Sequence, residues 1–289
     1  MAKPIEGGGH GGIFKATHGE RVLAVKILYA KPNNEDPEEV KKHLSLLYRE
    51  LIIWWTLDHP YILPMYGVDD LEGETRAAFP YLERGRISDY ALLIEKQGKK
   101  APLDEWMLQL VEAVGYLHGL QIVHGDLHVG NILIGDDERV KLVDFGRSKY
   151  CDSNQLTENS LMSMGGLCQA PELALADVNK GVRPTVESDI FSFAFTWLEL
   201  YSRRTPYYPK NPRTLCNSYK NKEKPKWPEN GLKSPHSQAK LEGLPVWKVM
   251  RRCFDVSPTS RPKLGEIESA LRSNNQYWIR QAYTEPSAY

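Results

Sequence analysis

"IVHGDLHVGNILIG", residues 122–135, sets two histidines, an aspartate and an asparagine between two apolar runs. Asp126 and Asn131 lie five residues apart, and His124 and His128 flank the aspartate. Taken alone, the stretch fits a metal site, a catalytic loop or a polar turn between two strands. Zinc is the weakest of these interpretations, because the stretch has no HExxH glutamate and no evident third ligand.

The composition is that of an ordinary globular protein, with 41% hydrophobic and 26% charged residues in a chain of 289. The 37 basic and 37 acidic residues give no net charge, which argues against general binding to nucleic acid or anionic membrane. No apolar run approaches the roughly 20 residues of a membrane span. Four widely spaced cysteines predict thiols in a reducing compartment, so a cytoplasmic location is expected.

The first part of the chain alternates short β-like runs with glycine around one helix. "GIFKAT" and "RVLAVKILY" predict a hairpin that turns at "HGE". Residues 36–57 predict an amphipathic helix with Asp36 as its cap. Two further strands are predicted at 62–68, "ILPMYGV", and at 77–82, "AAFPYL".

From about residue 83 the apolar periodicity becomes helical. Residues 103–120 predict a helix with Asp104 at its cap, and residues 187–204 are apolar nearly all round, as in a helix at the centre of a domain. Residues 205–243 resemble a surface connection, and two amphipathic helices close the chain. A β-rich part followed by a larger helical part is an α+β arrangement, with a cleft expected between them.

Two features of the first part suit a bound phosphate. The glycines of "GGGHGG" (7–12) would let backbone N–H groups approach phosphate oxygens, although such runs also form ordinary hairpins. Lys26 ends the apolar strand "LAVK" and would aim its ammonium into the cleft. Glu50 lies among apolar residues of the predicted helix, where an unpaired carboxylate costs free energy, so we expect it to pair with Lys26.

The opening stretch supplies the remaining chemistry. Asp126 offers an acceptor for the proton of a hydroxyl that attacks a phosphoryl group. Asn131 and Asp144, the latter from "VDFG", offer oxygen atoms to Mg²⁺, which prefers hard oxygen ligands. The residues therefore favour a catalytic loop, with His124 as a core histidine that supports it.

The ordered set of motifs resembles the protein kinases, and most closely their tyrosine-kinase-like serine/threonine group. The set comprises the glycine run, "LAVK", Glu50, "HPYI", "HGDLHVGN", "DFG", "APE", "SDIFSFA", "RRTPY" and "RP". The resemblance implies one kinase domain over 1–289 with a bilobal α+β fold. Its β-rich N-lobe would span about 1–82, its helical C-lobe about 83–272 and a tail about 273–289. ATP and Mg²⁺ are the implied cofactors, and a protein is the implied substrate.

The resemblance also assigns roles to single residues. Lys26 would bind the α- and β-phosphates and pair with Glu50, Asp126 would be the catalytic base, and Asn131 and Asp144 would bind Mg²⁺. The implied supporting contacts are Glu172 with Arg261, Asp189 with the catalytic-loop backbone, and a stacked column of Trp54, His124 and Phe145.

A further group of residues is assigned to the nucleotide by the same resemblance: Gly8, Gly11, Ile13, Ala24, Phe79, Pro80, Leu82, Asp89 and Leu133. Phe79 would narrow the pocket behind the adenine. Pro80 has no N–H, but only its carbonyl is needed there, and Leu82 would donate the N–H. Asp89 would contact the ribose, unless it only caps a helix.

Two catalytic-loop residues depart from the family pattern. Gly125 replaces the arginine that usually reads a phosphate on the activation segment, so we expect activity that is independent of phosphorylation there. His128 replaces a lysine or arginine and should stabilise the transferred phosphate less well, which predicts a slow enzyme. Gly165 and Cys168, before "APE", leave the acceptor residue open. The absence of the tyrosine-kinase proline–tryptophan signature favours serine or threonine.

Two other functions remain open beside an active kinase. Glu6, Gly125 and His128 would suit a pseudokinase that uses the fold as a scaffold. "HGDLHxxN" resembles the loop of aminoglycoside- and choline-type kinases, which act on small molecules, although "APE", "SDIFSFA" and "RP" belong to the peptide-binding lobe of protein kinases. The lysine-rich segment 210–227 would dock an acidic partner or form a solvated loop.

Overall fold

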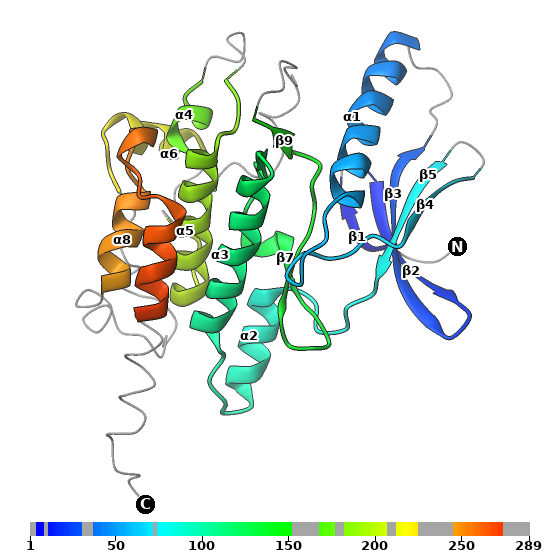
Figure 1. Ribbon diagram of the computed structural model, residues 1–289, viewed down its shortest axis with the longest axis horizontal. Coiled ribbons are helices and arrows are strands. Elements are labelled where there is room, and N and C mark those ends of the chain that lie inside the picture. The colour runs from blue at the N-terminus through cyan, green and yellow to red at the C-terminus, as the bar shows by residue number, and fades with distance from the viewer. Residues whose placement is uncertain are drawn as a thin grey trace, which may run out of the picture.

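The computed structural model describes residues 4–8, 11–30, 37–71, 74–151, 168–176, 182–206, 212–224 and 245–273. Figure 1 shows a β-sheet with one long helix at one end of the molecule and a group of helices at the other. The segment that carries β7 (Ile132–Ile134) lies between them. The predicted α+β arrangement is confirmed.

The N-terminal sheet is antiparallel and has the strand order β1-β2-β3-β5-β4. Its elements are β1 (Pro4–Gly8), β2 (Gly11–His18), β3 (Arg21–Ala30), β4 (Gly67–Leu71) and β5 (Glu74–Pro80), with α1 (Pro37–Trp55) inserted after β3. The predicted hairpin is confirmed, because β2 and β3 pair around a turn in which Gly19 has a φ of +59°. Along β5, buried and half-buried residues alternate, so one face of that strand packs on the core.

The strand predicted at 62–68 is wrong over its first five residues. β4 begins only at Gly67, and the preceding apolar run is an irregular segment. Pro64 has no N–H for a sheet ladder. Leu63 N–H instead donates to Leu142 O at 3.0 Å, and Leu142 N–H donates to Tyr61 O at 2.8 Å. The run is apolar because it packs against β8 (Val140–Leu142), not because it is a strand.

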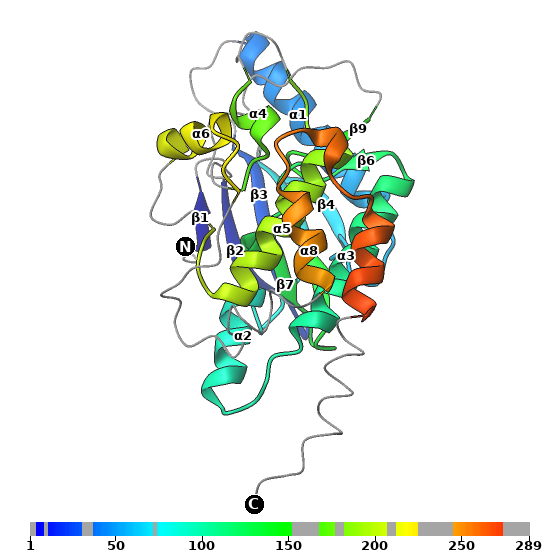
Figure 2. The same cartoon turned by 90° about the vertical axis from the view of Figure 1, so that its left-hand side faces the viewer.

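The C-terminal part is mainly helical. Its helices are α2 (Ile87–Lys96), α3 (Leu103–Gly119), α4 (Pro171–Ala174), α5 (Val186–Ser202), α6 (Pro212–Lys220), α8 (Pro245–Cys253) and residues 264–273. Two short β-pairs accompany them, β6 (Ile122–Val123) with β9 (Lys149–Tyr150) and β7 (Ile132–Ile134) with β8 (Val140–Leu142). α5 is buried on nearly every side, as predicted, and packs between α8 and α3 (Figure 1); in Figure 2, α8 lies in front of α5.

Three local predictions need comment. Asp104 does not cap α3, because the cap position is Pro102; Asp104 lies in the first turn and accepts a hydrogen bond from the Tyr201 hydroxyl. The connection predicted at 205–243 contains a helix, α6, whose Leu215 and Tyr219 are buried. Asp36, the expected cap of α1, lies outside the described residues.

The sheet and the helices share one cluster of buried apolar side chains, which extends from α1 to the helical residues 264–273. The sheet ends at Pro80 and α2 begins at Ile87, so the expected hinge lies between them. Residues 274–289, the expected tail, lie outside the described ranges. No helix among the described residues is long and apolar enough to cross a membrane.

Candidate active site

Lys26 stands at the centre of a three-residue ionic group. Its Nζ lies 2.9 Å from Glu50 Oε1 and 2.9 Å from Asp144 Oδ1. Burial lowers the pKa of Lys26, but the charges of Glu50 and Asp144 outweigh it and raise that pKa above its usual value. The predicted contact with Glu50 is present, and α1 is thereby attached to β3.

A column of aromatic rings supports this group. Phe145 is fully buried, and its ring centroid lies 5.1 Å from that of Trp54 and 5.2 Å from that of His124. Trp54 also packs on Phe79 at 4.3 Å and donates its Nε1–H to Leu63 O at 2.7 Å. The predicted column is present. It holds Phe145 inward, so that Asp144 next to it reaches Lys26.

The loop that carries Asp126 is held by a residue of α5. Asp189, only 1% exposed, accepts the backbone N–H of His124 at 2.8 Å and that of Gly125 at 2.9 Å. Its Oδ2 also lies 3.0 Å from His118 Nε2. A buried carboxylate needs such partners, and here they fix the backbone immediately before Asp126. The anchoring role expected of Asp189 matches this geometry.

Asp126 is surrounded by polar groups from three places in the chain. Asn131 Nδ2 donates to its backbone O at 2.9 Å, and Arg147 Nη1 donates to its Oδ1 at 3.1 Å. His128 Nε2 lies 3.8 Å from its Oδ2. Burial raises the pKa of Asp126, but the neighbouring His128 ring and the Arg147 guanidinium outweigh it and lower the pKa to about 2. The carboxylate is therefore ionised at neutral pH and able to accept a proton.

Sequence reasoning missed Arg147. The arginine directly after "DFG" was a visible signal, but its reach to Asp126 depends on how closely two loops approach. Gly125 has a φ of +77°, and a Cβ there would lie 2.9 Å from the backbone O of Arg147. Residue 125 must therefore be a glycine because of its backbone conformation and its close contact with Arg147 O. The lack of an arginine side chain there is a separate property of the same position.

Asn131 and Asp144 suit Mg²⁺ by their chemistry. The Asn131 amide nitrogen is used by Asp126, so its oxygen is the atom that would meet a metal ion. Burial raises the pKa of Asp144, but the charge of Lys26 outweighs it and lowers that pKa, which keeps a hard anionic ligand available. The described residues contain no group of three or more His, Cys, Asp or Glu side chains of the kind that holds zinc.

The residues assigned to the nucleotide lie along the strands and the hinge. Gly8 and Gly11 are paired at the end of the β1–β2 hairpin, and Ala24 is the register partner of Phe79 between β3 and β5. The other positions are Ile13 on β2, Pro80 at the end of β5, Leu82 in the hinge and Leu133 on β7. Asp89 is exposed in the first turn of α2; it is not that helix's cap, which is Arg86.

The contact between "APE" and "RP" is present and strong. Arg261 donates to both carboxylate oxygens of Glu172, at 2.7 and 2.6 Å, and to Glu187 O at 2.7 Å. Its side chain is 0% exposed, so the bidentate pair is shielded from water. It ties α4 to the chain just before the helical residues 264–273.

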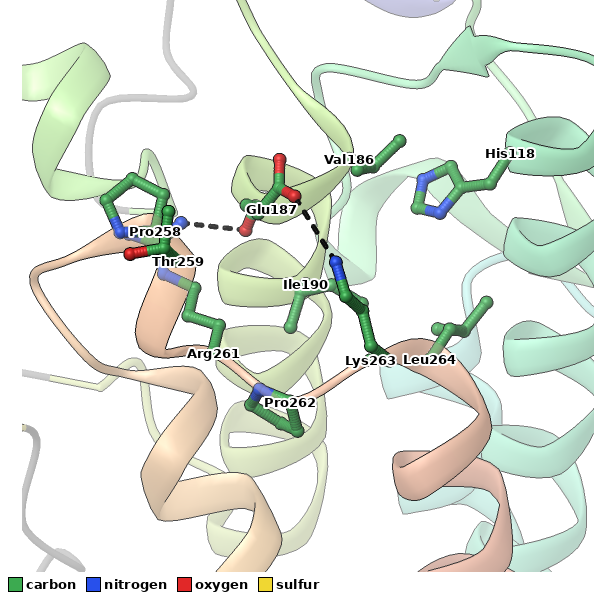
Figure 3. Close-up of a pocket in the computed structure, with 10 residues that line it drawn as sticks. All are labelled: His118, Val186, Glu187, Ile190, Pro258, Thr259, Arg261, Pro262, Lys263 and Leu264. Carbon is green, nitrogen blue, oxygen red and sulfur yellow. Dashed lines mark hydrogen bonds and ion pairs between the residues drawn. The ribbon is translucent and has the colours of Figure 1, made fainter.

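Arg261 also lines a cavity of about 290 Å³ shown in Figure 3. His118 from α3, Glu187 and Ile190 from α5, and Lys263 line it too. None of its lining residues belongs to the Lys26–Asp126–Asp144 group. Because His118 Nε2 lies 3.0 Å from Asp189 Oδ2, the cavity adjoins the residue that holds the backbone before Asp126.

Comparison with known proteins agrees with this geometry. The family model described as "Protein kinase domain" matches residues 2–274. The chain is 25% identical over 286 residues to human receptor-interacting serine/threonine-protein kinase 1. That alignment covers 93% of this chain and 39% of the human protein. It is 24% identical over 262 residues to Xenopus laevis serine/threonine-protein kinase 10-A, and that alignment covers 90% of this chain and 26% of the Xenopus protein.

A plant relative, Arabidopsis thaliana MDIS1-interacting receptor like kinase 2, is 26% identical over 280 residues, with 91% of this chain and 25% of that protein covered. The chain thus spans a quarter to two fifths of the length of these three relatives. The match to the family model, in contrast, covers nearly the whole of this chain. The chain belongs to the protein kinase domain family.

Proposed function

We propose that this chain is an active, ATP-dependent protein kinase that phosphorylates serine or threonine. The observation that carries the proposal is the assembled group in which Lys26 contacts both Glu50 and Asp144 at 2.9 Å. In this group a cation contacts a carboxylate that could hold Mg²⁺, and the nearby Asp126 is ionised at neutral pH. Sequence relatives whose names identify serine/threonine kinases support the choice of acceptor.

The chemistry follows from the positions of the side chains. When bound, Mg²⁺-ATP supplies the γ-phosphoryl group and ADP as the leaving group. The substrate hydroxyl oxygen forms a bond to phosphorus, the bond from phosphorus to the β,γ-bridging oxygen breaks, and Asp126 takes the hydroxyl proton. Lys26 would orient the α- and β-phosphates, and Asn131 and Asp144 would hold Mg²⁺ through oxygen atoms.

The nucleotide is proposed to lie between β1–β3 and the hinge. Gly8 and Gly11 would cover the phosphates with backbone N–H groups, while Ile13, Ala24 and Leu133 would contact the adenine ring. Phe79 would close the pocket behind the ring. The backbone O of Pro80 and the N–H of Leu82 would bind the adenine edge, and Asp89 the ribose.

Regulation by phosphorylation is a separate part of the proposal. Gly125 supplies no side chain to read an activation-segment phosphate, so activity should not require one. Arg49, Lys149 and Arg183 nevertheless gather positive charge at β9, since the charges of Arg49 and Arg183 lower the pKa of Lys149 and the charge of Arg183 lowers that of Arg49. Phosphatase treatment decides the matter. Loss of activity would assign these cations the role of reading a phosphate.

A pseudokinase scaffold is the second candidate, and His128 is the observation that favours it. Its Nδ1 accepts the N–H of Gly130 at 3.0 Å, so the ring is held to its own loop. The catalytic loop then offers no cation to the transferred phosphate. This alternative predicts nucleotide binding with no phosphotransfer.

The test is transfer of radiolabelled γ-phosphate to a peptide array containing serine, threonine and tyrosine acceptors. Wild type should label serine or threonine peptides, and Asp126→Asn and Lys26→Met should reduce labelling by about 10³-fold or more. Lys263→Met serves as a matched control, because it removes a 90% exposed lysine that also faces a glutamate. Equal labelling by wild type and Asp126→Asn would refute the proposal, and nucleotide binding without labelling would support the scaffold.

The lysine-rich segment 210–227 is proposed to dock an acidic partner. Within it, Lys224 already pairs with Asp255 at 3.1 Å, so Lys220, exposed at the end of α6, is the better contact. Lys220→Glu should weaken capture of an acidic peptide in a pull-down. The division of the chain near residue 82 and a cytoplasmic location remain predictions.

A further inference from the structure

We propose that Arg147 supplies the positive charge beside the catalytic carboxylate that this chain's catalytic loop lacks. The inference rests on the proposed phosphotransfer at Asp126. It names a residue outside the catalytic loop, three positions after Asp144, as a working part of the site.

The contact itself is direct and shielded. Arg147 Nη1 lies 3.1 Å from Asp126 Oδ1, and both side chains are 18% exposed. A guanidinium keeps its charge at any pH at which the protein is folded. An ion pair with this little solvent exposure is less screened than one at the surface. Arg147 therefore places a permanent charge where the acceptor hydroxyl and the transferred phosphoryl group must meet Asp126.

His128 lies farther from the carboxylate than Arg147 does. Its Nδ1 accepts the N–H of Gly130 at 3.0 Å, which holds the ring to its own loop. Its Nε2 lies 3.8 Å from Asp126 Oδ2, whereas Arg147 Nη1 lies 3.1 Å from Oδ1. A Cβ at residue 130 would lie 2.8 Å from the ring, so Gly130 is part of the same arrangement.

The backbone shows why Arg147 reaches this position. Ser148 Oγ donates to His124 O at 3.0 Å, which joins the segment after Asp144 to the catalytic loop. Beside that bond, Gly125 lets the backbone O of Arg147 approach to a distance that a side chain would block. Gly125 and His128 each stand where the family pattern has a basic residue. Arg147, from the segment after Asp144, supplies the cation that these two positions of the loop lack.

The first measurement is steady-state kinetics of Arg147→Met and of the conservative Arg147→Lys. Arg147→Met should lower kcat by about 100-fold, as expected for loss of one preorganised charged donor, with little change in KM for ATP. Arg147→Lys should retain more of the activity. Arg272→Met, which removes an arginine from an exposed ion pair with Glu268, is the matched control and should leave kcat unchanged.

A compensating variant separates this role from a purely structural one. His128→Lys restores a cation to the loop, so it should recover most of the kcat lost in Arg147→Met. The double-mutant cycle then shows strong coupling between positions 128 and 147. An Arg147→Met enzyme with unchanged or higher kcat overturns the proposal, since Arg147 would then be neutral or a restraint on Asp126. Failure of His128→Lys to rescue also overturns it.

A binding measurement keeps this inference distinct from the proposed function. Mg²⁺-ADP with aluminium fluoride mimics the transferred phosphoryl group, and calorimetry measures its affinity without turnover. Arg147→Met should lose the extra affinity that fluoride adds, while its affinity for Mg²⁺-ADP alone stays the same. If wild type and Asp126→Asn label peptides equally, the proposed function fails, and the fluoride comparison still decides the role of Arg147. Equal fluoride affinity in wild type and Arg147→Met counts against it.

Discussion

Gly125 combines two constraints at one position. Its φ of +77° lies in the left-handed region, where a side chain costs about 1–2 kcal/mol, and a Cβ there would lie 2.9 Å from Arg147 O. Gly98 separates these effects, since it has a φ of +75° and no heavy atom within 4 Å of an added Cβ. The conformational cost is therefore common to both glycines, and the close approach belongs to Gly125 alone.

We expect Gly125→Ala to lower the free energy of unfolding by about 1 kcal/mol more than Gly98→Ala does, because alanine must push the Arg147 backbone away. It should also lower kcat, which Gly98→Ala should not. Urea unfolding and peptide kinetics on the two variants check both expectations. Equal destabilisation would mean that the Arg147 backbone moves away from residue 125 without cost. Equal kcat would mean that Asp126 does not depend on this close contact.

At the scale of single elements, the buried ion pair of Glu172 with Arg261 holds α4 in position. Arg261→Met would leave the Glu172 carboxylate without its bidentate partner and should destabilise the protein by about 3–5 kcal/mol. The surface pair of Arg252 with Glu266 is the control, because both side chains are roughly half exposed and Arg252→Met should cost less than about 1 kcal/mol. Chemical denaturation measures both. Similar losses of unfolding free energy in the two variants would show that the burial of Arg261 does not strengthen its ion pair.

β9 brings Lys149 close to the charges of Arg49 and Arg183. Burial and then these charges lower the pKa of Lys149 from 10.5 to about 8. Below pH 8 both the folded and the unfolded chain hold the proton, and only the folded chain bears the cost of a buried charge. Between pH 8 and 10.5 the folded chain releases the proton first, so stability rises with pH.

Lys149→Met should therefore raise the free energy of unfolding at pH 7, by about 2 kcal/mol after allowance for partial screening. The gain should shrink as the pH approaches 10.5. Denaturation curves between pH 7 and 10.5 measure it, with the exposed Lys263→Met as a control that should show no gain. A loss of stability at pH 7 would mean that the contacts of Lys149 outweigh its cost.

Over the whole molecule, motifs with a direct chemical partner were predictable from sequence. Lys26 with Glu50 was predicted because a buried charge needs a counter-charge, and Glu172 with Arg261 was predicted from the resemblance to protein kinases. The start of β4 and the contact of Arg147 with Asp126 were not predictable in this way. Both depend on how loops distant in sequence approach each other, and residue type alone does not encode that distance.

The sheet and the helical part share one buried cluster, so the chain should unfold as a single unit that a bound nucleotide stabilises. Mg²⁺-ATP at about 100 times its Kd should add about 2.7 kcal/mol to the free energy of unfolding. Because Asn131 and Asp144 offer oxygen ligands, part of this gain should require the metal and disappear with EDTA. Asp144→Asn should lose that part, while Asp137→Asn, which alters an exposed carboxylate bonded to Lys141, should keep it. Thermal denaturation with ATP, with and without Mg²⁺, measures the difference. A gain that is equal without the metal, or equal in Asp144→Asn, would show that Asp144 does not hold Mg²⁺ and that the nucleotide is bound by Lys26 and the hinge alone.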